Sequence, residues 1–188
     1  MGIDAGIVTV SWLCFVAYWL IASRNTKRTV GRTGGGRGIG LRAVATVAVA
    51  LLATSGGLSG YGPHVPAEVD RAMGAVGAAL CAGGMAFAIW ARAQLGRNWG
   101  MPGSIKADPE LITGGPYSVV RHPIYTGVVA ALAGTALVHG MAWWIIVIGF
   151  LVYFLSSATA EEREMQRRFP DRYPEYRERT KRLIPYIV

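Results

Sequence analysis

A cluster of polar residues stands where a loop meets an apolar run, in the segment GPYSVVRHPIYTG (residues 115–127). The cluster contains Arg121, His122 and Tyr125, with Pro123 among them. Proline is favoured in the first turn of a helix, where its missing N–H is not needed. Pro123 therefore predicts a helix start. Because the positive end of a helix dipole favours anions, Arg121 and His122 are candidates for holding an anionic group.

A pair of carboxylates, Glu161 and Glu162, follows the last apolar run of the chain. Carboxylates at the C-terminal end of a helix oppose its dipole, so they need a positive partner. If the last two apolar runs form a helical hairpin, the acidic pair returns to the level of Arg121 and His122. The sequence thus predicts a pocket of cations, tyrosines and carboxylates, which suits a zwitterion carrying both a carboxylate and a positive centre.

Five apolar blocks must position these residues, and 52% of the 188 residues are hydrophobic. The blocks cover residues 3–22, 39–60, 69–90, 123–138 and 141–160. A membrane-spanning helix needs roughly 20 apolar residues, and only the fourth block is clearly shorter. His139 and Gly140 separate the last two blocks and predict a tight turn between them. No block shows the polar stripe of a soluble amphipathic helix. The sequence predicts an all-α integral membrane protein with five transmembrane helices.

The distribution of basic residues predicts the orientation. With five spans, the first loop, the third loop and the tail fall on one side of the bilayer. That side collects 18 of the 19 Lys and Arg residues, and only Arg71 lies opposite. The positive-inside rule makes it cytoplasmic, which places the N-terminus outside and both the C-terminus and the active site inside. The net charge of +8 then reflects orientation and contact with anionic lipids of the bilayer, so no nucleic-acid partner is expected.

The chain reads as a single domain, residues 1–188. Residues 1–92 hold three spans and a basic loop, and residues 93–188 hold the helical hairpin, a long irregular loop and a charged tail. Two short cytoplasmic helices are predicted in that tail, at 161–169 and 174–183, divided near Pro170. The stretch TGGGRGIG at 33–40 fits a dehydrogenase glycine pattern, but it lacks the surrounding βαβ unit that such a site requires. We interpret it as a connector that binds no nucleotide.

Four motifs in order carry a family resemblance: LITGGPYSVVRHPIYTG, the Glu-Glu pair, FPDRYPEY and RLIP. The pattern resembles the isoprenylcysteine carboxyl methyltransferase family, and membrane phospholipid N-methyltransferases share it. The resemblance covers about half of the chain, from roughly Gln94 onward. It implies an S-adenosylmethionine-dependent methyltransferase of five or more spans, without a Rossmann domain. The cofactor would lie in a cytoplasmic pocket of the C-terminal half, and a lipophilic acceptor would enter sideways from the bilayer.

The resemblance also implies site residues. Glu162 matches the family's cofactor-contacting glutamate, and Arg121 and Glu162 are the predicted catalytic residues. The predicted cofactor-binding residues are Pro109, Glu110, Leu111, Ile112, Tyr117, His122, Pro123, Ile124, Tyr125, Glu161 and Glu162. No metal is expected.

One departure from the family bears on the acceptor. Enzymes that act on prenylcysteine carry an arginine one helical turn before the glutamate, where this chain has Ala158. A carboxylate attacks an activated methyl group without a general base, so alignment and exclusion of water suffice. An amine must first lose a proton, which a tyrosine or glutamate can assist.

We predict methylation of a lipid-like or isoprenoid acceptor, with carboxylate O-methylation favoured. The alternatives are N-methylation of a phospholipid amine, an NADPH-dependent oxidoreductase similar to sterol reductases, and a non-enzymatic membrane scaffold.

Overall fold

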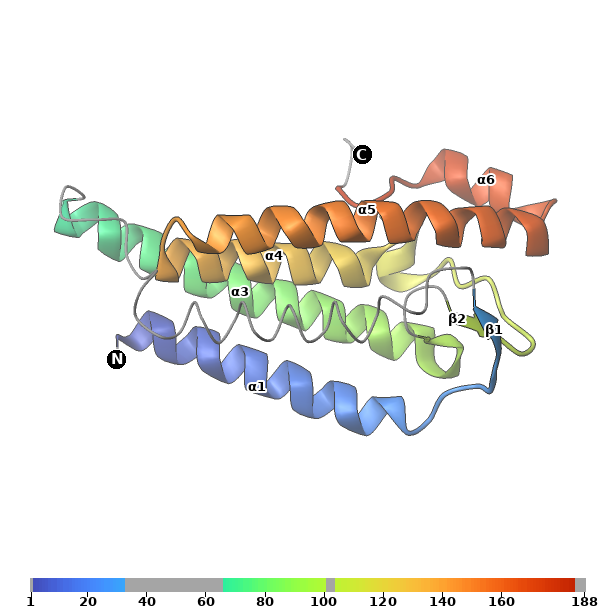
Figure 1. Cartoon of the computed structure of the whole chain (residues 1–188), viewed down its shortest axis with the longest axis horizontal. Helices are drawn as coiled ribbons and strands as arrows, with labels where there is room; N and C mark the ends of the chain where they lie inside the picture. Colours follow the sequence, from blue (N-terminus) through green and yellow to red (C-terminus); the bar gives the residue numbers. More distant parts are fainter. Residues whose placement is uncertain (1, 33–65, 101–103, 185–188) are drawn as a thin grey trace.

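In the part of the chain that the structure describes, four long helices lie side by side, and a short fifth one packs at the end of the bundle (Figure 1). The computed structural model describes residues 2–32, 66–100 and 104–184. The α-helices are α1 (Ile3–Ser23), α3 (Ala67–Leu95), α4 (Pro123–His139), α5 (Trp143–Arg168) and α6 (Arg172–Arg179). Within the described ranges, the loops contain the 3-10 turns η2 (Gly96–Asn98) and η3 (Gly115–Ser118) and the strands β1 (Thr29–Arg32) and β2 (Ser104–Lys106).

Three long apolar segments indicate that the protein is a membrane protein. By length and composition, α1, the segment Ala67–Asn98 and α5 can each cross a bilayer. The fourth predicted block forms α4, which has only 17 residues. The second predicted block, 39–60, and the glycine stretch 33–40 lie outside the described residues. The mainly helical fold is confirmed, whereas the count of five spans stays a prediction.

The predicted hairpin of α4 and α5 is present. The turn between them spans 140–142, and Gly140 has a φ of 110°, a conformation that favours glycine. The tail differs from the prediction in two places. No separate helix covers 161–169, because α5 continues without a break to Arg168, just before Pro170. The last helix ends at Arg179 rather than near 183, because the following residues extend along the start of α4.

Paired glycines bring α3 and α4 into backbone contact. A Cβ on Gly84 would lie 2.6 Å from the carbonyl oxygen of Gly127, and one on Gly77 would lie 2.6 Å from that of Gly134. The two pairs are seven residues apart on each helix. Because the residue number falls along α3 as it rises along α4, the two helices are antiparallel. In a membrane, small residues of this kind let helices approach closely enough for backbone packing.

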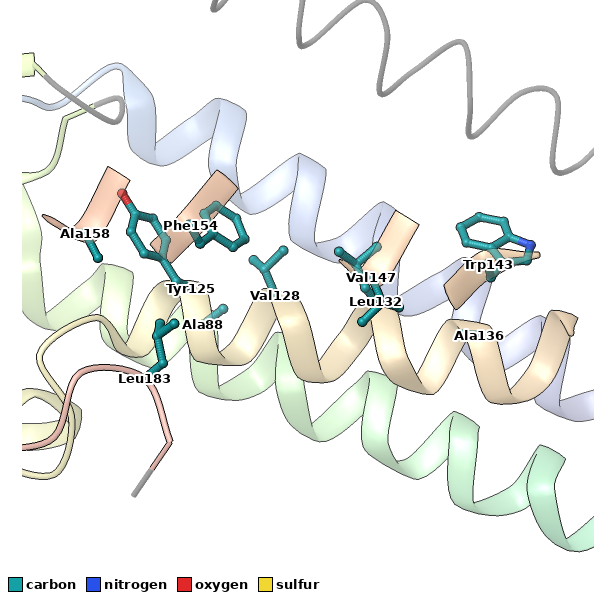
Figure 2. Packing of buried hydrophobic residues seen from close by; sticks show 10 residues of the cluster. All are labelled: Ala88, Tyr125, Val128, Leu132, Ala136, Trp143, Val147, Phe154, Ala158 and Leu183. Atoms are coloured by element: carbon teal, nitrogen blue, oxygen red, sulfur yellow. The ribbon is translucent and has the colours of Figure 1, made fainter. Parts of the chain in front are cut away.

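The apolar core follows the length of α4. Figure 2 shows Tyr125, Val128 and Leu132 along this helix, with Phe154 of α5 near its beginning and Trp143 near its end. At the end of the bundle away from the N-terminus, β1 pairs antiparallel with β2 (Figure 1). This pairing fastens the first connector to the loop that precedes α4. The polar start of α4 and the end of α5 lie at the same end of the molecule.

Candidate functional site

A cavity of about 820 Å³ opens between α1, α4, α5 and the loop before α4. Ten of the twelve predicted site residues line it: Pro109, Glu110, Leu111, Ile112, Tyr117, Arg121, His122, Ile124, Tyr125 and Glu161. These residues come from three separate stretches of the chain, and the hairpin and the loop bring them together. The structure places Pro123 and Glu162 outside the lining. Pro123 is fully buried at the first turn of α4, where it starts the helix.

Glu162 faces protein cations instead of the cavity. Its Oε1 atom accepts a hydrogen bond from Nε of Arg121 at 2.9 Å, and its Oε2 atom accepts one from Nη2 of Arg182 at 2.8 Å. Only 7% of the Glu162 side chain is exposed, against 10% for Arg121 and 27% for Arg182. The expected positive partner of the acidic pair is therefore supplied by the chain itself.

The last described residues hold this arrangement in place. The backbone N–H groups of Arg121 and His122 donate to the carbonyl oxygens of Lys181 and Arg182, at 2.8 and 3.1 Å. The hydroxyl of Thr126 donates to the carbonyl of Leu183 at 2.6 Å. Sequence reasoning missed Arg182, because no local pattern shows that the tail returns to the start of α4. Its only signal was the motif RLIP, which takes part in the family resemblance.

His122 bridges the two carboxylates. Its Nδ1 lies 3.5 Å from Oε2 of Glu161, and its Nε2 lies 3.4 Å from Oε1 of Glu162. Burial by itself would lower the pKa of His122, but hydrogen bonding and attraction to Glu161 and Glu162 outweigh burial and raise it. An imidazolium can donate to both carboxylates at once, which a neutral imidazole cannot. The anions that Arg121 and His122 hold are thus carboxylates of α5.

Glu161 occupies the cavity wall beside two aromatic rings. The Tyr125 hydroxyl donates to Oε1 of Glu161 at 2.6 Å. The Tyr125 ring stacks on His122 with 5.4 Å between ring centroids, and on Phe154 with 4.3 Å. Because these two ring contacts hold Tyr125 in place, the carboxylate that it binds is also held in one position. Glu161, and not Glu162, presents negative charge to the cavity.

The loop wall of the cavity is fastened by two basic residues that the sequence did not single out. Nζ of Lys27 donates to the carbonyl of Asp108 and to Oε1 of Glu110, each at 2.7 Å. On the other side, Arg92 is 2% exposed and donates to the carbonyls of Ala22 and Gly96. Cations are favoured there, because these carbonyls lie at the C-terminal ends of α1 and α3.

Arg92 also orders an aromatic corner of the cavity. Its guanidinium lies 4.7 Å from the ring centre of Trp99, which packs edge-on against Trp19. Both tryptophans line the cavity. Among the residues that the structure describes, no group of three or more His, Cys, Asp or Glu side chains could hold a metal ion.

The middle part of the cavity, away from His122, is apolar. It continues between Trp12 and Phe15 of α1, Leu132 of α4 and Phe150 of α5, and it ends near Trp143. The cavity therefore combines a polar end, at the level of Glu161 and the loop, with a long apolar arm inside the helical bundle. A ligand that fills both parts needs a charged or polar head and a hydrocarbon tail.

A family model described as phospholipid methyltransferase matches residues 72–172. The match begins in α3 and ends at the start of α6, so it contains every predicted site residue. A comparison with individual curated proteins gives no match. Because the matched region covers more than half of the chain and includes the whole hairpin, the chain belongs to the phospholipid methyltransferase family.

Proposed function

We propose that the protein transfers a methyl group from S-adenosylmethionine to a lipid-like acceptor, with the reaction taking place at the polar end of the cavity. The observation that carries this proposal is the cavity itself. Residues predicted for the cofactor surround one end of it, and an arm suited to hydrocarbon leads away from them between membrane-spanning helices. A soluble substrate would not need such an arm.

The residues at the polar end fit the cofactor. Glu161 offers a carboxylate to a positively charged sulfonium or ammonium group, and Trp99 and Tyr117 offer aromatic surface to an adenine ring. The loop residues 109–112 supply backbone groups on the facing wall. When bound, S-adenosylmethionine supplies a methyl group that is already activated for transfer. In this proposal Glu161 takes over the contact that the resemblance assigned to Glu162.

The remaining catalytic work consists of alignment and proton handling. Tyr125 and His122 fix Glu161, and the packed rings of Tyr125 and Phe154 keep water from this side of the cavity. Alignment of two reactants in a closed site accounts for a large part of many rate enhancements. Arg121 acts by position: it holds Glu162, and through Glu162 it orients His122.

Two acceptor chemistries follow from the site. Carboxylate O-methylation is the one that the sequence favoured, and it needs a cation to hold the substrate carboxylate. On the described wall, Arg121 already binds Glu162 and Arg168 already binds Glu164, and the buried Ala158 replaces the arginine of the prenylcysteine enzymes. An amine acceptor needs no such cation. Its proton can pass to Glu161, so the geometry favours an amine as the second candidate.

The test is a binding titration of the purified protein. We expect S-adenosylmethionine and S-adenosylhomocysteine to bind and NADPH not to bind. Loss of one charge-assisted contact weakens binding about ten- to a hundredfold. Glu161→Gln should therefore weaken the binding of S-adenosylmethionine by about this factor. It should weaken the binding of S-adenosylhomocysteine less, because that compound lacks the sulfonium charge. Glu178→Gln, on the exposed face of α6, serves as the matched control.

The outcomes separate the alternatives. Binding of NADPH alone would support the reductase-like reading, and binding of neither compound would support a scaffold. If donor binding is present, methyl transfer to a long-chain amine and to a long-chain fatty acid should then be compared. Transfer to the acid alone would refute the amine acceptor while leaving the methyltransferase in place.

A further inference from the structure

The far end of the cavity carries polar side chains that methyl transfer does not use. Thr135, His139 and Trp143 line this end, at the last turns of α4 and the first turn of α5. The rings of His139 and Trp143 lie 5.6 Å apart between centroids. The middle part of the cavity is lined by apolar side chains. If the cavity bound only hydrocarbon, its far end would be expected to have an apolar lining as well.

One of these polar groups lacks a partner. The Trp143 side chain is 8% exposed, and its indole N–H is buried with no hydrogen-bond partner in the described part of the chain. The neighbouring hydroxyl is different: Thr135 donates to the carbonyl of Ala131 and accepts from the indole N–H of Trp12. Buried donors are almost always satisfied, so an unpaired one beside a cavity indicates a missing acceptor atom.

A belt of tryptophans at the membrane surface is the structural alternative for Trp143. The next residue, Trp144, suits that role better, because it is only half-buried and does not line the cavity. Trp143 instead lines the cavity and stands at the end of the buried cluster that runs along α4 (Figure 2). Its position is that of a residue that contacts the content of the cavity.

The distance between the two polar ends sets the length of a ligand that reaches both. Tyr125 and His139 both line the cavity, and they are fourteen residues apart on α4, about 21 Å at 1.5 Å per residue. An extended chain advances about 1.2 Å per bond, as three bonds of a polypeptide cover roughly 3.5 Å. A chain of about seventeen bonds would therefore join the two ends.

We propose that the arm binds one extended hydrocarbon chain lengthwise, and that Trp143 and His139 recognise an oxygen atom near the end of that chain. The acceptor class is then a long-chain lipid with the methylated group at one end and a hydroxyl or carbonyl group about 21 Å away. This inference rests on the proposed function only for the identity of the first group, the one that is methylated. The recognition of the oxygen is a binding property that can be measured without catalysis.

The probes are hexadecylamine and the same amine with a hydroxyl on its last carbon, which places about seventeen bonds between nitrogen and oxygen. Each is titrated calorimetrically into the purified full chain in lipid nanodiscs. We expect the hydroxylated amine to bind about three- to tenfold more tightly, as one neutral hydrogen bond would give. Without a partner at the far end, the preference would reverse, because burying an unpaired hydroxyl is unfavourable.

Trp143→Phe removes the N–H and keeps an aromatic ring, so it should abolish this preference. Trp144→Phe should retain it. Thermal melting of both variants shows whether either change disturbs the fold, and the comparison of the two probes on the unaltered chain does not depend on any variant. Equal binding of the two amines, or a preference that persists in Trp143→Phe, would overturn the inference.

Titration of S-adenosylhomocysteine on the same samples separates this inference from the proposed function. If S-adenosylhomocysteine binds and the two amines are not distinguished, the inference fails and the proposed function stands. If the amines are distinguished and S-adenosylhomocysteine does not bind, the far end is a recognition site and the proposed function fails.

Discussion

Replacement of Glu162 by glutamine tests whether this residue belongs to the framework or to the ligand site. From the sequence, an unpaired carboxylate at a helix end predicts that Glu162→Gln leaves the ligand-free protein as stable or slightly more so and removes most of the cofactor affinity. The structure predicts the opposite. Glu162 accepts hydrogen bonds from Arg121 and Arg182, lies close to His122, and does not line the cavity.

The size of the effect follows from these contacts. Two guanidinium groups lose their anion, and the Arg121 side chain, 10% exposed, has little access to water. Removing one partner of a buried ion pair costs about 3–5 kcal/mol, because the remaining charge is left uncompensated. For chains of this length one kcal/mol corresponds to about 2–4 °C in melting temperature, so the expected decrease is about 6–20 °C.

The assay is thermal melting of the purified protein with and without S-adenosylhomocysteine. The matched control is Glu175→Gln, which breaks an exposed pair with Arg179 on α6 and should leave the melting temperature almost unchanged. An unchanged melting temperature for Glu162→Gln combined with lost ligand binding would refute the framework role and restore the assignment made from the sequence.

Two further predictions concern the helix contact and the bridging histidine. Gly84→Ala should destabilise the protein, because the new Cβ would lie 2.6 Å from the carbonyl of Gly127. Gly83→Ala, which meets nothing within 4 Å, should stabilise it slightly through helix propensity, and equal melting temperatures would refute the close contact. The raised pKa of His122 means that protonation stabilises the fold. That contribution is fully present below pH 6.5 and is lost as the pH rises through the higher pKa of the folded state. His122→Gln should remove this part of the pH dependence, measured by denaturant unfolding at several pH values, and an unaltered pH profile would contradict the bridge.

Much of the fold could be predicted, because the relevant signals are local. Apolar length gave α1, α3 and α5, Pro123 gave the start of α4, and Gly140 marked the turn of the hairpin. The glycine pairs between α3 and α4 could not be assigned from the sequence. The sequence shows where the small residues are, but it does not show which residue Gly84 contacts, because that depends on how the two helices are aligned in space.

Ten of the twelve residues implied by the resemblance line one cavity, whereas the contacts among them could not be predicted. The resemblance named residues that line one cavity, yet it did not show which carboxylate faces the cavity. Glu161 and Glu162 are adjacent in the sequence, and a helix turns by about 100° from one residue to the next, so they point in different directions. Arg121 and Arg182 together neutralise Glu162, and the position of Arg182 depends on the path of the tail after α6.

The contacts among these side chains explain why the pattern Arg-His-Pro-x-Tyr occurs together with Glu-Glu. Arg121 and Arg182 fix Glu162, Glu162 and Glu161 fix His122, and His122 and Tyr125 fix Glu161. Buried ion pairs seldom add much net stability, because the charges must first lose their water. They do restrict side chains to one geometry, and in this site that geometry holds the Glu161 carboxylate on the cavity wall. Substitutions in this set should therefore change the position of Glu161 even when the substituted residue touches no ligand.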